Sequence, residues 1–395
     1  MRPQDAGSAV DLSRRALGLQ VSPTVAVAQK AAAFSAAGQA VLDFSVGEPD
    51  QPTPGHIVDA ATAALNGGRT RYTPAAGLPE LRAAVAARYK KDFKVAFADS
   101  EVAITCGGKQ ALYLACQALL NRGDEVIVPS PYWPTFTEAV RLAGARPILV
   151  PTLEKDGFKI TARLISKATG PRTKAVILNS PCNPTGSIID SEDLLVIGDM
   201  AARRKFTLLY DDTYARLVYG RQDNSALQAL RDAVGDRLVV LGSASKSFCM
   251  TGWRIGWLLG PNALVDACAA LVSHSTQCPT SFAQVGAIEA LTGPQKFVQD
   301  LVAEYRRRRD FLHAALSAIP EPWLPAEESQ DAPRYVQGER VRHRKFGGGV
   351  VRAVAGQGKG LKVTVEFDDQ DIGTKQLLVA YAGLERDWEG GEESP

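Results

Sequence analysis

Short apolar runs alternate with longer amphipathic segments between about residues 40 and 290. Six of the runs are rich in branched aliphatic residues and are predicted to be strands, over 101–105, 124–129, 145–150, 173–178, 206–210 and 237–242. Helical patterns lie between and after them, including 109–123, 191–205 with Ser191 as its expected N-cap, and 294–319. Strands that alternate with helices predict an α/β fold around a mostly parallel sheet.

The pattern changes after about residue 320. Residues 320–335 hold four prolines and four acidic residues, a composition typical of a linker. Farther on, Val363, Val365 and Phe367 alternate with polar residues, as in a strand with one buried face. The predicted division is an N-terminal arm over 1–45, a main α/β domain over 46–319, a linker over 320–335, a small β-barrel over 336–386 and an acidic tail over 387–395.

The overall composition points to an ordinary globular protein. The chain has 395 residues, with 45 Lys and Arg against 43 Asp and Glu, and a net charge of +2 gives no indication of nucleic-acid or membrane binding by the chain as a whole. No apolar run approaches the length of about 18 residues that a membrane span needs. The six cysteines lack C-x-x-C spacing and are expected to be reduced, which favours a cytoplasmic location.

Polar and glycine-rich segments follow the predicted strands, where ligands bind in parallel sheets. These segments are CGGKQ, PSPYW, NSPCNPTG, DDTY and SASKSF. Lys246 lies in the last of them, just after the strand over 237–242. A lysine in such a turn can form a covalent Schiff base with an aldehyde cofactor, although a single lysine is also an ordinary surface residue.

A phosphate site is the second prediction. Gly107, Gly108 and Lys109 stand between a predicted strand and a helix, where backbone N–H groups at a helix N-terminus bind phosphate. Ser243 and Arg254, on either side of Lys246, would add a hydroxyl and a guanidinium to the same phosphate. Each feature also has a plain structural interpretation, as a tight turn, a turn serine and a surface arginine.

A ring-binding site is the third prediction. Asp211 ends a predicted strand, where burial of its carboxylate calls for a cationic partner such as a protonated pyridine nitrogen. Tyr214 and Asn183 would hydrogen-bond a phenolic oxygen, and Trp133 would stack on a heteroaromatic ring. The structural alternatives are a helix cap for Asp211, core positions for Tyr214 and Trp133, and a turn for Asn183. Taken together, an aldehyde-binding lysine, a phosphate site, a buried carboxylate and a stacking ring match pyridoxal 5′-phosphate.

Residues 12–319 resemble the fold type I pyridoxal-phosphate aminotransferases, in particular the bacterial class I aspartate aminotransferases. The stretches that match are SPTVAV, VGEPD, RYTPAAGLPELR, GGKQAL, DEVIVPSPYWP, PRTKAVILNSPCNPTG, YDDTY and SKSFCMTGWRIGW. The resemblance implies an α/β large domain with a mostly parallel sheet and a small domain that this chain truncates.

The resemblance also implies a role for each candidate residue. Lys246 would bond to the cofactor and move the proton at the substrate α-carbon, while Asp211 would keep the pyridine nitrogen protonated. The other cofactor-binding residues would be Gly107, Gly108, Lys109, Trp133, Asn183, Tyr214, Ser243 and Arg254. Tyr72 resembles a tyrosine that reaches the phosphate of the partner subunit, which implies a homodimer with shared sites.

Substrate recognition is implied less specifically. The substrate-binding residues implied are Gly47, Lys109, Trp133 and Asn183, and Thr24 falls at a matching N-terminal position. Lys109 resembles a receptor for the distal carboxylate of a dicarboxylic amino acid. The implied reaction is amino transfer from aspartate to 2-oxoglutarate, with glutamate, prephenate-type and aromatic substrates left open.

The resemblance ends before the segment that in this family carries the arginine for the substrate α-carboxylate, and no residue in 320–395 matches it. The alternative function is therefore a catalytically impaired aminotransferase whose C-terminal barrel binds a protein or a nucleic acid, and a fusion without a selected role is a third interpretation. The barrel sequence is similar to the Tudor-like domain of UvrD-type helicases. Residues 334–386 contain ten Lys or Arg and six Asp or Glu, a net charge of 10 − 6 = +4. No helicase nucleotide-binding motif accompanies the barrel.

Overall fold

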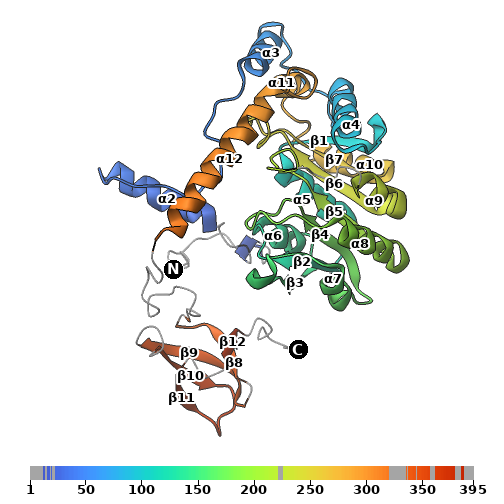
Figure 1. Ribbon diagram of the computed structural model, residues 1–395. Coiled ribbons are helices and arrows are strands. Elements are labelled where there is room, and N and C mark those ends of the chain that lie inside the picture. The colour runs from blue at the N-terminus through green and yellow to red at the C-terminus, as the bar shows by residue number, and fades with distance from the viewer. Residues whose placement is uncertain are drawn as a thin grey trace. The chain divides into compact units, whose positions relative to one another are not determined.

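The computed structural model of the chain divides into two compact units, Met1–Arg306 and Arg307–Pro395, and the boundary between them falls within the last long helix (Figure 1). The structure describes residues 12–13, 16–17, 19, 23–220, 226–319, 335, 337–343, 345–355, 361–378 and 384–386. Of the predicted linker it describes Tyr335 alone, and the predicted acidic tail lies outside the described residues.

A seven-stranded sheet forms the centre of the first unit, with strand order β1-β7-β6-β5-β4-β2-β3. The strands are β1 (Val102–Thr105), β2 (Glu125–Ser130), β3 (Arg146–Pro151), β4 (Thr173–Asn179), β5 (Thr207–Asp211), β6 (Leu238–Ser243) and β7 (Gly256–Leu259). All six predicted strands are confirmed, and so is the mostly parallel sheet. The sequence interpretation missed β7, which pairs antiparallel with both β1 and β6. Its place in the sheet depends on pairing with strands that are distant in the sequence, which a local apolar pattern does not reveal.

Helices cover both faces of this sheet (Figure 1). The helices are α2 (Pro23–Ala36), α3 (Gly55–Asn66), α4 (Pro79–Phe93), α5 (Gly108–Leu119), α6 (Thr135–Leu142), α7 (Ala162–Ala168), α8 (Ser191–Arg204), α9 (Ala226–Val234), α10 (Asn262–Ser273), α11 (Ser281–Thr292) and α12 (Lys296–Ser317). The three predicted helices are confirmed as α5, α8 and α12. The predicted N-cap of α8 was wrong, because Asp190 occupies that position and Ser191 is the first helical residue. The Asp190 carboxylate makes no cap bond and instead accepts a hydrogen bond from Lys159 Nζ at 2.8 Å.

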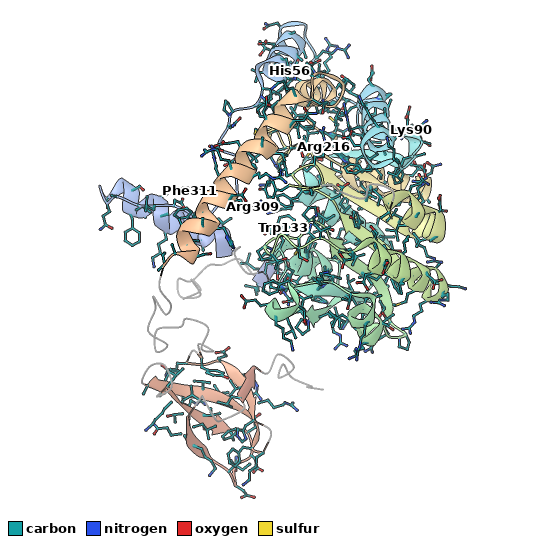
Figure 2. The ribbon with its side chains drawn as sticks, in the orientation of Figure 1. His56, Lys90, Trp133, Arg216, Arg309 and Phe311 are labelled. Carbon is teal, nitrogen blue, oxygen red and sulfur yellow. The ribbon has the colours of Figure 1, made fainter. Side chains whose placement is uncertain are left out.

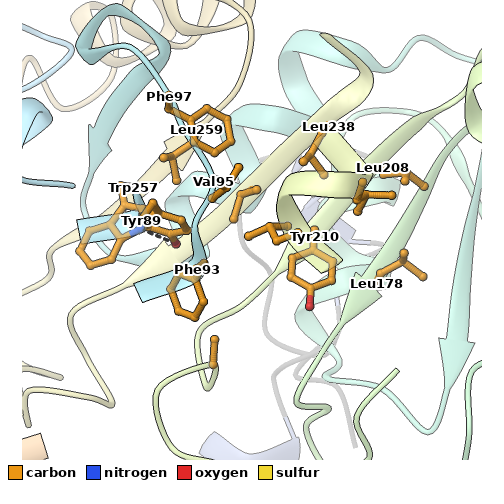
Figure 3. Close-up of a cluster of buried hydrophobic side chains, with 14 of the residues drawn as sticks. Tyr89, Phe93, Val95, Phe97, Leu178, Leu208, Tyr210, Leu238, Trp257 and Leu259 are labelled. Carbon is orange, nitrogen blue, oxygen red and sulfur yellow. Dashed lines mark hydrogen bonds between the residues drawn. The ribbon is translucent and has the colours of Figure 1, made fainter. Parts of the chain in front are cut away.

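Two apolar clusters lie on opposite faces of the sheet, and alternate residues of β4 contribute to each. Ala175 and Ile177 pack with residues of α5, α6 and α10, whereas Val176 and Leu178 pack with residues of α4, α8 and α9. Figure 3 shows part of the second cluster, in which Leu178, Leu208 and Leu238 come from adjacent strands. Burial on both faces explains why the strands are continuous apolar runs. The sheet is therefore a rigid support for the loops at its edge.

The second unit contains a five-stranded antiparallel sheet with order β11-β10-β9-β8-β12. Its strands are β8 (Arg340–His343), β9 (Gly347–Ala355), β10 (Lys362–Phe367), β11 (Thr374–Leu378) and β12 (Leu384–Arg386). Val363, Val365 and Phe367 are buried, which confirms the predicted alternation in β10. Val341 and Val351 join them in a separate small core. The C-terminal segment thus has its own apolar core, as expected of an independent β domain.

Several large apolar side chains of the described residues face solvent. Phe311, labelled in Figure 2, is 71% exposed, and Leu312 and Leu316 on the same helix are more than half exposed. Leu42 and Phe44, before the first strand, are 89% and 90% exposed. In the part of the chain that the structure describes, no helix is long and apolar enough to cross a membrane.

Candidate active site

The polar loops predicted to form a site begin at one edge of the sheet. Asp211 pairs in register with Asn179 of β4 and with Leu241 of β6, so the loops after these three strands start side by side. Backbone and side chain link them further, because Asn179 Nδ2 donates to the Asp211 carbonyl oxygen at 3.2 Å. A helix separates each of these strands from the next in the sequence, yet their ends lie side by side in one hydrogen-bonded sheet.

Lys246 lies in the turn that follows β6 and points toward the N-terminal segment. Its Nζ donates a hydrogen bond to the carbonyl oxygen of Gly47 at 2.5 Å, across 199 positions of sequence. Partial burial lowers the pKa of Lys246 below its usual range; the nearby carboxylate of Glu48 opposes this shift and the Arg254 guanidinium adds to it. A lower pKa leaves more of the amine uncharged near neutral pH, which is the nucleophilic form.

The predicted phosphate site is tightly packed around Gly107. Gly107 has φ of 87°, and a Cβ atom there would lie 2.1 Å from Nη2 of Arg254. Arg254 itself adopts φ of 56° and donates from Nη2 to the Cys106 carbonyl oxygen at 3.3 Å. Next to it, a Cβ atom on Gly108 would lie 3.4 Å from Cβ of Ser243. The glycines therefore let α5 begin against the Lys246 turn, and bring four predicted phosphate ligands together.

Asp211 is a buried carboxyl group without a cationic partner among the described residues. Its Oδ1 accepts a hydrogen bond from the backbone N–H of Thr213 at 3.0 Å. Burial raises the pKa of Asp211 above its usual value, and the hydrogen bonds from Thr213 oppose the rise. Such a carboxylate gains most from a cation placed beside it, which fits a protonated ring nitrogen.

Tyr214 and Asn183 lie on neighbouring loops and interact with each other. Burial and the charge of Asp211 raise the pKa of Tyr214 to about 12, while a hydrogen bond with Asn183 opposes the rise. The phenol is therefore protonated near neutral pH and can donate a hydrogen bond. Trp133 is half-buried after β2 (Figure 2), and Lys109 Nζ lies 5.2 Å from its ring centroid. Lys109 thus lies close to the predicted stacking ring, at the first turn of α5.

Two predicted positions remain apart from this group. Tyr72 is 83% exposed, and within the described part of the chain no hydrogen bond joins it to another candidate residue. Thr24 is at the start of α2, but its side chain lies outside the described residues.

The sequence interpretation missed two polar side chains at the site. Glu48 lies close enough to influence Lys246 and accepts a hydrogen bond from the Thr251 hydroxyl. Thr213 caps Asp211, and the Asp-x-Thr order of an Asx turn is a signal that was available in the sequence. Both residues stand in stretches already singled out, but only the fold brings them to Lys246 and Asp211.

Comparison with known proteins identifies the family. The model for aminotransferase class I and II matches residues 39–331, and the PcrA/UvrD tudor domain model matches residues 337–386. Aspartate aminotransferase of Geobacillus stearothermophilus is 41% identical over 309 residues, which are 78% of this chain and 79% of that protein. The chain belongs to the class I and II aminotransferases. The Thermus thermophilus aspartate/prephenate aminotransferase is likewise 41% identical, over 311 residues that are 78% of this chain and 80% of that protein.

The fold of this aminotransferase matches solved structures of the family. The structure of aspartate aminotransferase from Thermus thermophilus with maleate aligns with a TM-score of 0.75 and 40% identity, covering 78% of this chain and 81% of that one. Pyridoxal 5′-phosphate is the cofactor of this class, and the chain is a pyridoxal-phosphate-dependent aminotransferase. The residues present fit that group, because the site offers an uncompensated buried carboxyl, a depressed lysine pKa and a close glycine–arginine contact.

Gly107 offers a direct test of the phosphate site. In Gly107→Ala the new methyl group would overlap the Arg254 guanidinium and adopt an unfavourable positive φ, so we expect cofactor affinity to fall at least about tenfold, since each tenfold is about 1.4 kcal/mol. Equilibrium titration with pyridoxal phosphate measures the change. Gly123→Ala is the matched control, because Gly123 has a similar φ of 95° and no atom lies within 4 Å of the position that its Cβ would take. Equal losses in both variants would contradict a phosphate site at Gly107.

Proposed function

We propose that this aminotransferase transfers the amino group of aspartate, or of a closely similar amino acid, to 2-oxoglutarate. The observation that carries the proposal is the 2.5 Å contact between Lys246 Nζ and the Gly47 carbonyl oxygen, because it sets the reactive amine against the segment expected to meet the substrate carboxylate. The names of the relatives and the maleate in one solved structure support a dicarboxylic substrate.

Each residue then has a part in the reaction. When bound, the cofactor supplies a ring that accepts electrons from the substrate α-carbon. Lys246 Nζ would hold the cofactor through its aldehyde carbon and would move the proton at the substrate α-carbon. Asp211 would keep the ring nitrogen protonated, and the hydroxyl of Tyr214 and the amide of Asn183 would bind the ring oxygen. Gly107, Gly108, Ser243 and Arg254 hold the phosphate.

We assign Lys109 and Trp133 to the face where the substrate side chain binds. The Lys109 amine, 5.2 Å from the Trp133 ring centroid, carries the positive charge that a distal carboxylate needs. Trp133 at the same time covers the cofactor ring and limits access of water. This pairing favours dicarboxylic over simple aliphatic amino donors.

We further propose that the enzyme is a homodimer. The exposed Tyr72 is available to reach the phosphate of a second copy, and the exposed Leu42 and Phe44 are apolar groups that a partner or a further segment would cover. Sedimentation in the presence of the cofactor distinguishes a dimer from a monomer.

The half-reaction with aspartate tests the function. We expect purified protein with bound pyridoxal phosphate to convert to the pyridoxamine form when aspartate is added, seen as a change in the cofactor absorbance band. The rate is expected to be lower than in family members that carry the arginine for the substrate α-carboxylate, because no residue in 320–395 matches that arginine. Loss of one partner of a buried charge pair costs about 2 to 5 kcal/mol, or about 30-fold to several thousand-fold in rate. Alanine is the control donor and should react more slowly. Cofactor uptake without any conversion by aspartate would instead favour the impaired enzyme.

The alternative function places the activity of the chain in its C-terminal domain. The positive charge there is partly neutralised within the sheet, because Arg340 pairs with Asp368 and Arg352 pairs with Glu366. These pairs leave less charge for contact with phosphates, so a protein partner is favoured over a nucleic acid. The binding role of this domain stays a prediction.

A further inference from the structure

A chain of buried polar groups lies directly behind the candidate active site. Asp212, which follows Asp211, is 6% exposed, and its Oδ1 accepts a hydrogen bond from the Tyr89 hydroxyl at 2.9 Å. Tyr89 in turn accepts a hydrogen bond from Trp257 Nε1 at 3.0 Å, the contact drawn in Figure 3. Because the indole N–H can only donate, the Tyr89 proton is directed to Asp212. The hydrogen bonds therefore run in one direction, from Trp257 to Tyr89 and from Tyr89 to Asp212.

Two buried side-chain atoms beside these hydrogen-bonded groups have no hydrogen-bond partner within the described residues. They are Oδ2 of Asp212 and Nη1 of Arg216. Both residues line one cavity of about 20 Å³, and a cavity of about 10 to 15 Å³ is enough for one water. Water accepts a hydrogen bond from an arginine N–H, and it can donate to an ionised carboxyl oxygen or accept from a protonated one, so a single water can bond to both atoms.

The same cavity touches both loops of the active site. Its lining includes Thr213 after β5, and Ser247 and Phe248 beside Lys246. Arg216 lies over the Phe248 ring, with its Cζ 5.0 Å from the centroid. Arg216 is itself held by Asp92, to which its Nε is paired at 3.1 Å. We call Asp212, Tyr89, Trp257 and Arg216 the Asp212 network.

The charged and titratable groups that face Asp212 come from three elements. They are Tyr210 and Asp211 on β5, Arg88 and Tyr89 on α4, and Arg216 on the loop after β5. Burial raises the pKa of Asp212 to about 8; the hydrogen bond from Tyr89 opposes the rise and the charge of Asp211 adds to it. Below that pH the Asp212 carboxyl is mostly protonated, so it adds little negative charge beside Asp211.

We propose that the Asp212 network, completed by one water in the cavity, positions Asp211 and Lys246 for the reaction. The inference rests on the proposed function of those two residues. Asp212 acts through its neighbours, and it keeps a second negative charge away from Asp211 near neutral pH. Because one water bridges Asp212 to Arg216, a change in either residue is transmitted to both loops.

The indole N–H resonance of Trp257, observed in cofactor-free protein labelled at tryptophan and assigned with Trp257→Phe, tests the network without any activity. We expect this resonance to titrate with a midpoint near pH 8 and to stop titrating in Asp212→Asn. In Arg216→Met the midpoint should rise, since a nearby positive charge favours the ionised carboxylate. Asp190→Asn, at an exposed carboxylate paired with Lys159, is the control and should leave the midpoint unchanged.

Cofactor affinity tests the positioning role separately. Asp212→Ala removes the acceptor of the Tyr89 hydroxyl and the proposed bond to the water, and it is expected to weaken pyridoxal phosphate binding about tenfold at pH 7. Asp212→Asn keeps an acceptor for Tyr89, so its affinity for pyridoxal phosphate should stay within about twofold of wild type. A midpoint that persists in Asp212→Asn, an unchanged midpoint in Arg216→Met, or full affinity in Asp212→Ala each overturns the proposal. If wild-type protein takes up no cofactor but the resonance behaves as expected, the proposed function fails while the network stands.

Discussion

Replacement of Lys246 by alanine is expected to abolish the absorbance band of the bound cofactor and to lower the rate of amino transfer by at least about 10⁴-fold, the upper range for loss of general acid–base catalysis. The reason is specific to the site. Lys246 is the amine that hydrogen-bonds Gly47 at 2.5 Å, and burial lowers its pKa toward the nucleophilic form. Without it, the covalent attachment and the proton transfer proposed for this residue are both lost.

The measurement combines absorbance spectra with the aspartate half-reaction. Lys246→Arg separates charge from chemistry, because it keeps a cation beside Glu48 but offers no amine to the aldehyde. We expect it to be as inactive as the alanine variant. Lys159→Ala removes an exposed lysine paired with Asp190 and should behave as wild type. A normal cofactor band in Lys246→Ala would remove this residue from the mechanism.

Much of the fold was predictable because its signals are local. Most of the strands are apolar runs that are buried on both faces, and β3, at the edge of the sheet, is a partly exposed apolar run, so the hydrophobic pattern alone located β1 to β6. The short antiparallel β7 was missed for the opposite reason, since its place between β1 and β6 depends on pairing with distant residues. The predicted Ser191 cap was wrong by one position, because the helix begins at Ser191 and the extended residue before it is Asp190.

The candidate site was predictable only in part. Lys246, Asp211 and Arg254 stand in dense motifs, and the resemblance to a family names them. The Asp212 network could not be predicted from the sequence. Tyr89 lies 123 positions from Asp212 and 168 positions from Trp257, and only packing in the fold brings them together. Gly107 was expected to bind phosphate, but its close approach to Arg254 depends on how α5 packs against β7.

Replacement of Asp211 by asparagine is expected to have opposite effects on the free protein and on the reaction. Without the cofactor, Asp211 is a buried carboxyl with a raised pKa and no cationic partner among the described residues. Asparagine keeps the acceptor for the Thr213 N–H and removes the cost of burying a charge. The thermal unfolding midpoint of the cofactor-free variant should therefore be unchanged or higher.

With the cofactor bound, the same change removes the negative partner that we propose for the ring nitrogen. Loss of one member of a buried charge pair costs about 2 to 5 kcal/mol, so we expect the aspartate half-reaction to slow by about 30-fold to several thousand-fold. Asp190→Asn makes the same chemical change on the surface and should affect neither measurement. If Asp211→Asn instead lowered the stability of the cofactor-free protein and left the half-reaction intact, Asp211 would be a structural cap. The combination of a stable fold and slow chemistry is what a carboxylate reserved for the cofactor requires.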